Sequence, residues 1–171
     1  LPGLKLPPVN LGDVMDHVHS VIETIQHHDS TERFCGLGAE VRFGSPVFFD
    51  DHVVEVDGDR ISAGKWIIAT GSSPAPPPVD GIDDVPYWTN ETVFSQRELP
   101  SRLIVLGGGP IGLEMSQAFA RLGSKVTVVE FMDQILGPED ADLAEILKAR
   151  MELEGVEFHV KNRAVKAQSD G

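Results

Sequence analysis

Residues 103–112 read LIVLGGGPIG, an apolar run that leads directly into a cluster of glycines. The cluster fits the pattern G-x-G-x-x-G, with Gly107, Gly109 and Gly112 at the fixed positions. Gly107 allows a tight turn out of a strand, Gly109 lets a pyrophosphate approach the backbone, and Gly112 lets the next helix pack closely on the sheet. That helix directs its free N–H groups and positive dipole end at the phosphates, so Ile111 at its start belongs to the predicted cofactor-binding site.

The second strand of this unit ends in Glu130, about twenty residues after the glycine loop, where a dinucleotide site places its ribose-binding acid. A carboxylate there accepts hydrogen bonds from ribose hydroxyls and repels the additional phosphate of NADP. No arginine follows Glu130 closely enough to offset that repulsion. The sequence therefore predicts NAD(H) as cofactor, with NAD preferred over NADP. The competing interpretation is a glycine-rich turn near a surface acid, which leaves the register of strand, loop, helix and acid unexplained.

From residue 103 onward the chain alternates between strand-like and helix-like patterns. Strands are predicted at 103–106, 125–129 and 156–160, where apolar residues form short runs or alternate with polar ones. Helices are predicted at 110–122 and 140–153, where apolar residues recur every three or four positions. Such alternation favours a parallel sheet with right-handed crossovers. The expected fold class is α/β, with half of a Rossmann-like parallel sheet.

The first 73 residues show a different pattern. Apolar spacing predicts a helix over 12–27 and short strands over 40–70, in which Asp57-Gly58 is a hairpin-turn signal. These strands are expected to form a small antiparallel β-meander. The apolar run at 66–69 predicts a strand buried on both faces. Five prolines within 74–86 predict an extended linker and a domain boundary.

Composition argues against several other classes of function. The net charge of −13 disfavours nucleic acid as a partner. No apolar run approaches the roughly 18 residues that a membrane span requires. Cys35 is the only cysteine, so a reducing, cytoplasmic setting is expected, and a small semi-buried residue is favoured over a reactive thiol because no base is placed beside it. His17 and His19 face different ways on a helix, and neither they nor the other histidines predict a metal site.

Residues 106–127 closely resemble the pyridine nucleotide-disulfide oxidoreductases, in particular the mercuric reductase-like and dihydrolipoamide dehydrogenase-like branches. The resemblance rests on the glycine loop with its trailing Glu114 and on the run QAFARLGSKVT at 117–127. The order of IATGS at 68–72, a Pro-rich stretch and Leu99-Pro100 agrees with it. The resemblance covers nearly the whole chain.

In such enzymes an FAD-binding domain contains an inserted NAD(P)-binding domain, and a C-terminal domain forms the dimer. The resemblance therefore implies that residues 1–73 are part of an FAD-binding domain, 74–100 a Pro-rich linker or crossover, and 101–171 part of an NAD(P)-binding domain. It also implies roles for six residues. Those near FAD are Thr70, Gly71, Ser45 and Pro46, and those near the nicotinamide are Pro110, which gates its pocket in some relatives, and Glu114, which also approaches the flavin ring.

Several family features are missing from these 171 residues: the FAD glycine motif, the redox-active cysteine pair, the C-terminal histidine–glutamate pair and the second half of the NAD sheet. We therefore expect an internal piece of an FAD-dependent oxidoreductase that passes hydride from NADH through FAD to a disulfide or similar acceptor. The piece would supply dinucleotide binding, contain no catalytic residue and be inactive alone. The alternative is a non-catalytic NAD-sensing module. The expected partners are small-molecule dinucleotides, with no nucleic acid and no membrane. The whole enzyme is expected to be a homodimer, and exposed strand edges favour self-association of the piece.

Overall fold

The protein is described by a computed structural model that places residues 9–169. The chain divides into two compact units, one formed by residues 19–73 and the other by residues up to 18 together with those from 74 onward. The boundary therefore falls inside helix α1 (Leu11–Gln26), whose first half belongs to the second of these units. Within the described residues, no helix combines the length and apolar character needed to cross a membrane.

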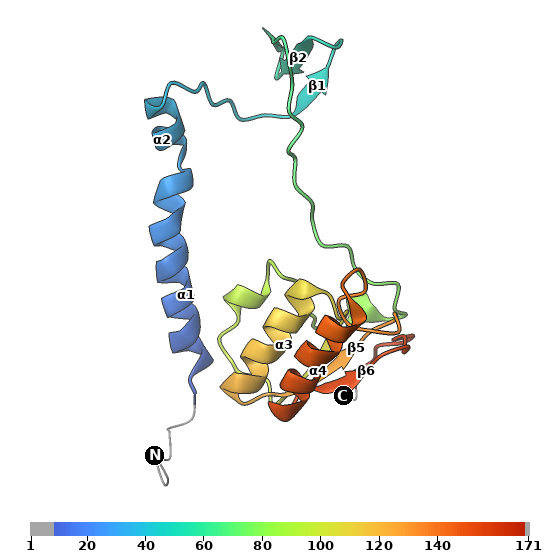
Figure 1. Ribbon diagram of the computed structural model, residues 1–171. Helices are drawn as coiled ribbons and strands as arrows, with labels where there is room; N and C mark the ends of the chain where they lie inside the picture. Colours follow the sequence, from blue (N-terminus) through green and yellow to red (C-terminus); the bar gives the residue numbers. More distant parts are fainter. Residues whose placement is uncertain (1–8, 170–171) are drawn as a thin grey trace. The chain divides into compact units, whose positions relative to one another are not determined.

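The unit that contains residues 74–169 is built on a parallel sheet with strand order β4-β5-β6. Its strands are β4 (Arg102–Leu106), β5 (Lys125–Val129) and β6 (Glu157–His159). Helices α3 (Pro110–Leu122) and α4 (Ala141–Leu153) make the crossovers, as Figure 1 shows. The alternating strands and helices confirm the predicted α/β class.

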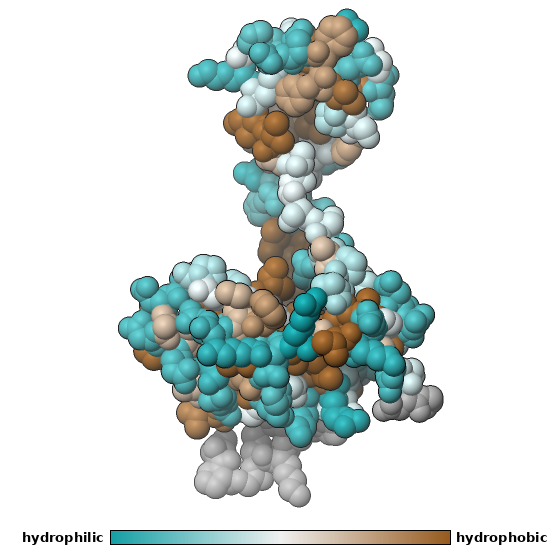
Figure 2. All heavy atoms as spheres, turned by 90° about the vertical axis from the view of Figure 1, so that its right-hand side faces the viewer, coloured by the Kyte–Doolittle hydropathy of each residue, from teal (hydrophilic) through white to brown (hydrophobic). Residues whose placement is uncertain are grey.

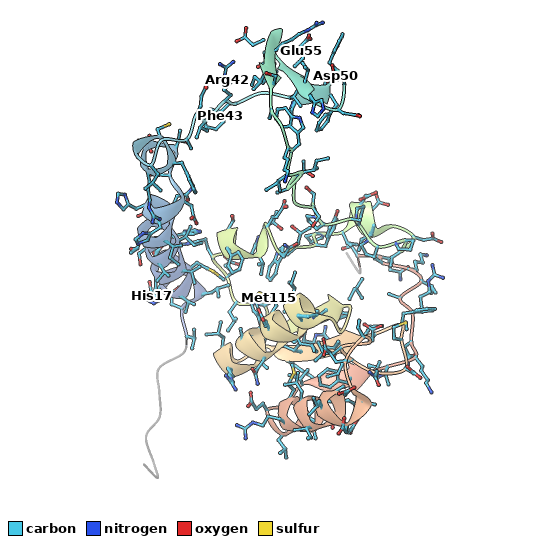
Figure 3. All side chains as sticks on the ribbon, turned by 45° about the horizontal axis from the view of Figure 1, so that its top comes forward. His17, Arg42, Phe43, Asp50, Glu55 and Met115 are labelled. Carbon is cyan, nitrogen blue, oxygen red and sulfur yellow. The ribbon has the colours of Figure 1, made fainter. Side chains whose placement is uncertain are left out.

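One face of this sheet packs against the two helices and forms the core. The register pairs Leu103 with Val126 and Val105 with Val128, so these four side chains share a face. Val126 and Val128 are fully buried. Their partners in the core come mostly from α3 and α4 and include Leu113, Phe119, Ala144, Met151 and, from α3, the partly buried Met115 that is labelled in Figure 3.

The start of α1 and the end of the Pro-rich segment also pack on this unit. Leu11 and Met15 of α1 are buried in the same core, and the Arg97 side chain forms an ion pair with Asp16. The Asp80 backbone pairs with the segment at 165–167, donating to Val165 O at 3.1 Å and accepting from Ala167 N at 2.8 Å. The Pro-rich segment is thus packed at its C-terminal end rather than extended throughout. Two short 3-10 turns, η2 (Ile82–Asp84) and η3 (Val93–Ser95), lie between residue 80 and β4.

The unit of residues 19–73 holds the second half of α1, the turn η1 (His27–Asp29), the short helix α2 (Thr31–Gly36) and an antiparallel meander. The meander consists of β1 (Pro46–Phe48), β2 (Val53–Val56) and β3 (Asp59–Ser62). Asp57 and Gly58 connect β2 to β3 with φ of 51° and 93°, the positive values that a two-residue hairpin turn requires. The predicted hairpin, meander and first helix are confirmed.

The predicted buried strand at 66–69 is wrong. These residues have no regular secondary structure, and Ile67 and Ile68 are 92% and 73% exposed. A strand buried on both faces needs a neighbouring strand to complete its hydrogen bonds, and within residues 9–169 no strand pairs with this run. Trp66 instead packs edge-to-face on Phe48 of the meander, with ring centroids 5.8 Å apart. Figure 2 shows the apolar side chains that remain on the surface.

Candidate dinucleotide-binding site

The glycine loop lies at the carboxyl ends of β4 and β5. Gly107 N donates to Val129 O at 2.9 Å, which extends the parallel ladder by one residue past β4. The chain then turns sharply with Gly107 at φ 109°. A β-carbon built on Gly109 would meet no protein atom within 4 Å. The backbone is therefore open to an approaching group at the position that the sequence assigns to the pyrophosphate.

Helix α3 begins in this loop with no capping side chain. Gly109 is the N-cap residue and Pro110 occupies the first turn, so no side-chain oxygen takes up the free amides. Pro110 and Ile111 are exposed. Gly112 packs against the loop so closely that a β-carbon there would collide with Gly107 O. The start of the helix thus presents N–H groups and a positive dipole end at the mouth of the loop.

Glu130 follows β5 and faces this loop. Its Oε2 accepts from Gly108 N at 2.5 Å, and its Oε1 accepts from Met132 N at 2.6 Å. Its main chain is held by the end of β6 and the turn after it, because Glu130 N donates to His159 O and Asn162 N donates to Glu130 O. The glycine loop follows β4 and Glu130 follows the neighbouring strand β5, and the Glu130 side chain contacts the loop directly.

Sequence reasoning missed the part played by Gly108 and by the segment after β5. Gly108 is buried, and its carbonyl accepts from Leu136 N at 2.8 Å. Ile135, only 1% exposed, packs beside it. A glycine at a position where the motif allows any residue was the one available signal. The path of residues 131–136 has no periodic pattern from which this contact could be read.

Glu114 lies one turn into α3, exposed, on the wall of an open groove of about 460 Å³ between α3 and α4. The groove begins at Pro110 and is lined mostly by apolar side chains. It therefore lies next to the start of α3, where the nicotinamide end of a dinucleotide is expected. The remaining lining residues are Leu113, Gln117, Leu136, Glu139, Leu143, Leu147 and Met151.

The residues assigned to FAD by resemblance lie in the other unit. Pro46 opens β1, next to Ser45, and Thr70 and Gly71 follow the exposed run at 66–69. All four are exposed, and Gly71 has φ 66°. The described residues thus form no enclosed cradle around these positions, and we derive no step through FAD from them.

Other side chains that could carry chemistry form no further site in the described part of the chain. Cys35 is exposed on α2 and unpaired, in contrast to the semi-buried position expected for it. Residues 9–169 contain no group of three or more His, Cys, Asp or Glu side chains arranged to hold a metal. His17 lies on α1, as Figure 3 shows.

A one-sided parallel sheet with a glycine loop and a facing acid defines half of a doubly wound nucleotide-binding fold. Comparison with known families makes this specific, because the family model described as pyridine nucleotide-disulphide oxidoreductase matches residues 9–171. The chain belongs to this family of oxidoreductases, whose members use FAD and NAD(P)H.

Curated relatives fall in both branches expected from the resemblance. A mercuric reductase from Streptomyces lividans is 30% identical over 99% of this chain and 38% of its own length. The mitochondrial dihydrolipoyl dehydrogenase of Schizosaccharomyces pombe is 34% identical over 95% of this chain and 33% of its own length. The chain therefore spans about a third of the length of these relatives.

Solved structures agree in fold. LpdA from Mycobacterium tuberculosis superposes with a TM-score of 0.77 at 28% identity, over 99% of this chain and 39% of that one. RclA from Escherichia coli, described as an HOCl-induced flavoprotein disulfide reductase, gives 0.76 at 27% identity, over 93% and 37%. These matches extend over both units of the chain.

Proposed function

We propose that this chain supplies the pyridine-nucleotide site of an FAD-dependent oxidoreductase, in which hydride from NADH passes through FAD to a disulfide or similar acceptor. The observation that carries the proposal is the position of Glu130 against an open glycine loop at the carboxyl ends of two parallel strands. Family membership supports the reaction class. We assign no residue of this chain to binding of the electron acceptor.

In this proposal the chain binds and orients, and the bound nicotinamide and flavin supply the hydride chemistry. Free amides at the start of α3 hold the pyrophosphate, which the open space at Gly109 admits. Glu130 accepts hydrogen bonds from the adenosine ribose. Pro110 and Glu114 then lie on the side of α3 along which the nicotinamide would extend.

Gly109→Val tests the site directly. The β-carbon of the valine would meet no protein atom within 4 Å, and the side chain would extend into the space assigned to the pyrophosphate. We expect NADH affinity, measured by calorimetry, to fall about a hundredfold or more, equivalent to about 3 kcal/mol, while the melting temperature stays unchanged. Ala118→Val, on the exposed part of the same helix, is the control and should bind normally. Undiminished NADH affinity in Gly109→Val would reject the assignment.

We also propose that NADH is preferred over NADPH, because the Glu130 carboxylate would lie beside the additional phosphate of NADPH. Glu130→Arg should shift the ratio of the two affinities toward NADPH by about tenfold or more. Lys161→Gln serves as the control for a change of charge near the site, because the Lys161 side chain is exposed and it is the backbone N–H of this residue that donates to Met132 O. An unchanged ratio in Glu130→Arg would remove Glu130 from cofactor selection.

The colour of the full gene product separates an enzyme from a sensor. A yellow protein with flavin absorbance supports the oxidoreductase, whereas a colourless protein that still binds NADH supports an NAD-sensing module. We propose a reducing, cytoplasmic compartment, which suits the exposed thiol of Cys35. The Schizosaccharomyces pombe relative is mitochondrial by name, so cell fractionation is the test that decides.

A further inference from the structure

Both backbone polar groups of Gly108 are held by the segment that follows β5. Its N–H donates to Glu130 Oε2 at 2.5 Å, and its carbonyl accepts from Leu136 N at 2.8 Å. Leu136 adopts φ 49°, a conformation that a leucine rarely takes. The middle of the glycine loop is therefore fixed by contacts that need no bound nucleotide.

The Glu130 carboxylate has more than one bond within the protein. Its second oxygen accepts from Met132 N at 2.6 Å, so the same side chain ties the loop to the first residues after β5. Hydrogen bonds from backbone N–H groups to a carboxylate are shorter and stronger than those between neutral groups. Gly108 is buried and Ile135 is only 1% exposed beside it, so loss of the carboxylate would leave a sheltered amide without its partner.

We propose that Glu130 is a positioning residue for the glycine loop in addition to being its ribose-binding acid. It fixes the Gly108 amide, and through it the open turn at Gly109, in the shape that receives a pyrophosphate. This inference rests on the proposed function, because it assigns a second role to a residue of the same site. The positioning role has a consequence that the ribose-binding role does not have. Removal of Glu130 should weaken binding even of a dinucleotide whose adenosine ribose has no hydroxyls for Glu130 to contact.

Amide hydrogen exchange, followed by NMR on the chain without nucleotide, tests the positioning role apart from binding. In Glu130→Ala we expect exchange at Gly108 and Met132 to rise about tenfold or more, because both amides lose their acceptor. Glu130→Gln can satisfy one of the two amides with its single oxygen, so only one should lose protection. Amides of the central strand β5, such as that of Val128, report whether the sheet remains folded. Unchanged exchange at Gly108 in a folded Glu130→Ala chain would overturn the proposal.

Binding supplies the second readout, with NADH and with an analogue whose adenosine ribose lacks the 2′- and 3′-hydroxyls. If Glu130 acts only through the ribose, Glu130→Ala and the wild type bind the analogue equally. If it positions the loop, the variant binds the analogue about threefold or more weakly than the wild type does. Glu91→Gln, an exposed acid outside the loop, should match the wild type in both assays. A wild-type chain that does not bind NADH would reject the proposed function, whereas equal binding of the analogue would reject only the positioning role.

Discussion

At the scale of single residues, the glycines of the loop have separable tasks that the structure makes visible. A β-carbon on Gly112 collides with Gly107 O, whereas one on Gly109 meets no protein atom. The two positions therefore differ in what a methyl group would disturb. At Gly112 it disturbs the packing of α3 on the loop, and at Gly109 it disturbs only a bound group.

Alanine at each position should separate folding from binding. We expect Gly112→Ala to lower the free energy of unfolding by about 1–3 kcal/mol, since the helix must move away from the loop. Gly109→Ala should change it by less than about 0.5 kcal/mol, yet weaken NADH binding. Urea denaturation and calorimetry provide the two measurements. Equal stability losses in both variants would contradict the division of tasks.

The sequence predicted the position of Glu130 at the glycine loop but not the hydrogen bonds of Gly108. The position of Glu130 follows from strand spacing, because parallel neighbours end at the same edge of the sheet. The bonds of Gly108 were not predictable, since they depend on how residues 131–136 fold back over the loop. An irregular segment leaves no periodic trace in the sequence.

At the scale of elements, one partly buried acid joins the ends of α3 and α4. Glu154, whose side chain is 14% exposed, accepts from Arg121 Nε at 2.8 Å, from Arg150 Nε at 2.8 Å and from Gln117 Nε2 at 3.1 Å. Hydrogen bonds from Arg121 and then from Arg150 are the main reasons that the pKa of Glu154 falls from 4.5 to about 2. The carboxylate thus stays charged in the folded protein well below the pH at which it is protonated in the unfolded chain.

This lowered pKa predicts a pH dependence of stability. The contribution of Glu154 is fully present above pH 4.5 and is lost as the pH falls through about 2, because the folded state then takes up the proton. Glu154→Gln should therefore melt at a lower temperature than the wild type at neutral pH, and the difference should shrink as the pH falls from 4.5 toward 2. Thermal melts across this range provide the measurement.

Glu145→Gln is the matched control for this acid. Glu145 lies on the same helix but is 68% exposed, and its Oε1 is 3.6 Å from Lys148 Nζ. Its replacement should shift the melting temperature little at any pH, since exposed ion pairs contribute little. A Glu154→Gln deficit that stayed constant down to pH 2 would show that packing, not charge, is what Glu154 contributes.

Elements that form through their own local sequence pattern were predicted well. Elements that need a neighbouring strand to form were predicted badly. The sequence of helix α3 has apolar residues at helical spacing, glycines before its first residue and Gly123 after its last. Its observed limits therefore agree with the predicted 110–122. The run at 66–69 has strand-like composition but, among the described residues, no strand to pair with. A helix satisfies its backbone within itself, whereas a strand requires a neighbour.

At the scale of the whole chain, the parallel sheet has one face that no helix among residues 9–169 covers. Ile104 and Leu106 of β4 point away from the core and are 67% and 39% exposed. Parallel sheets are usually covered on both faces, and within the described residues β4 pairs only with β5, so its outer edge is free as well. Two exposed apolar side chains on this face, next to an unpaired edge, favour association with a second copy of the chain.

We expect the chain to self-associate through this face as its concentration rises. Ile104→Lys should weaken association about tenfold or more, because a lysine would have to lose its hydration in the contact. Since Ile104 is already exposed, the same change should leave the melting temperature nearly unaltered at low concentration. Leu153→Lys is the control, since Leu153 is 85% exposed at the end of α4 and lies outside the sheet. Sedimentation velocity over a wide concentration range measures all three proteins. A chain that remains monomeric throughout, or an Ile104→Lys variant that associates as strongly as Leu153→Lys, would show that the uncovered face is not the contact.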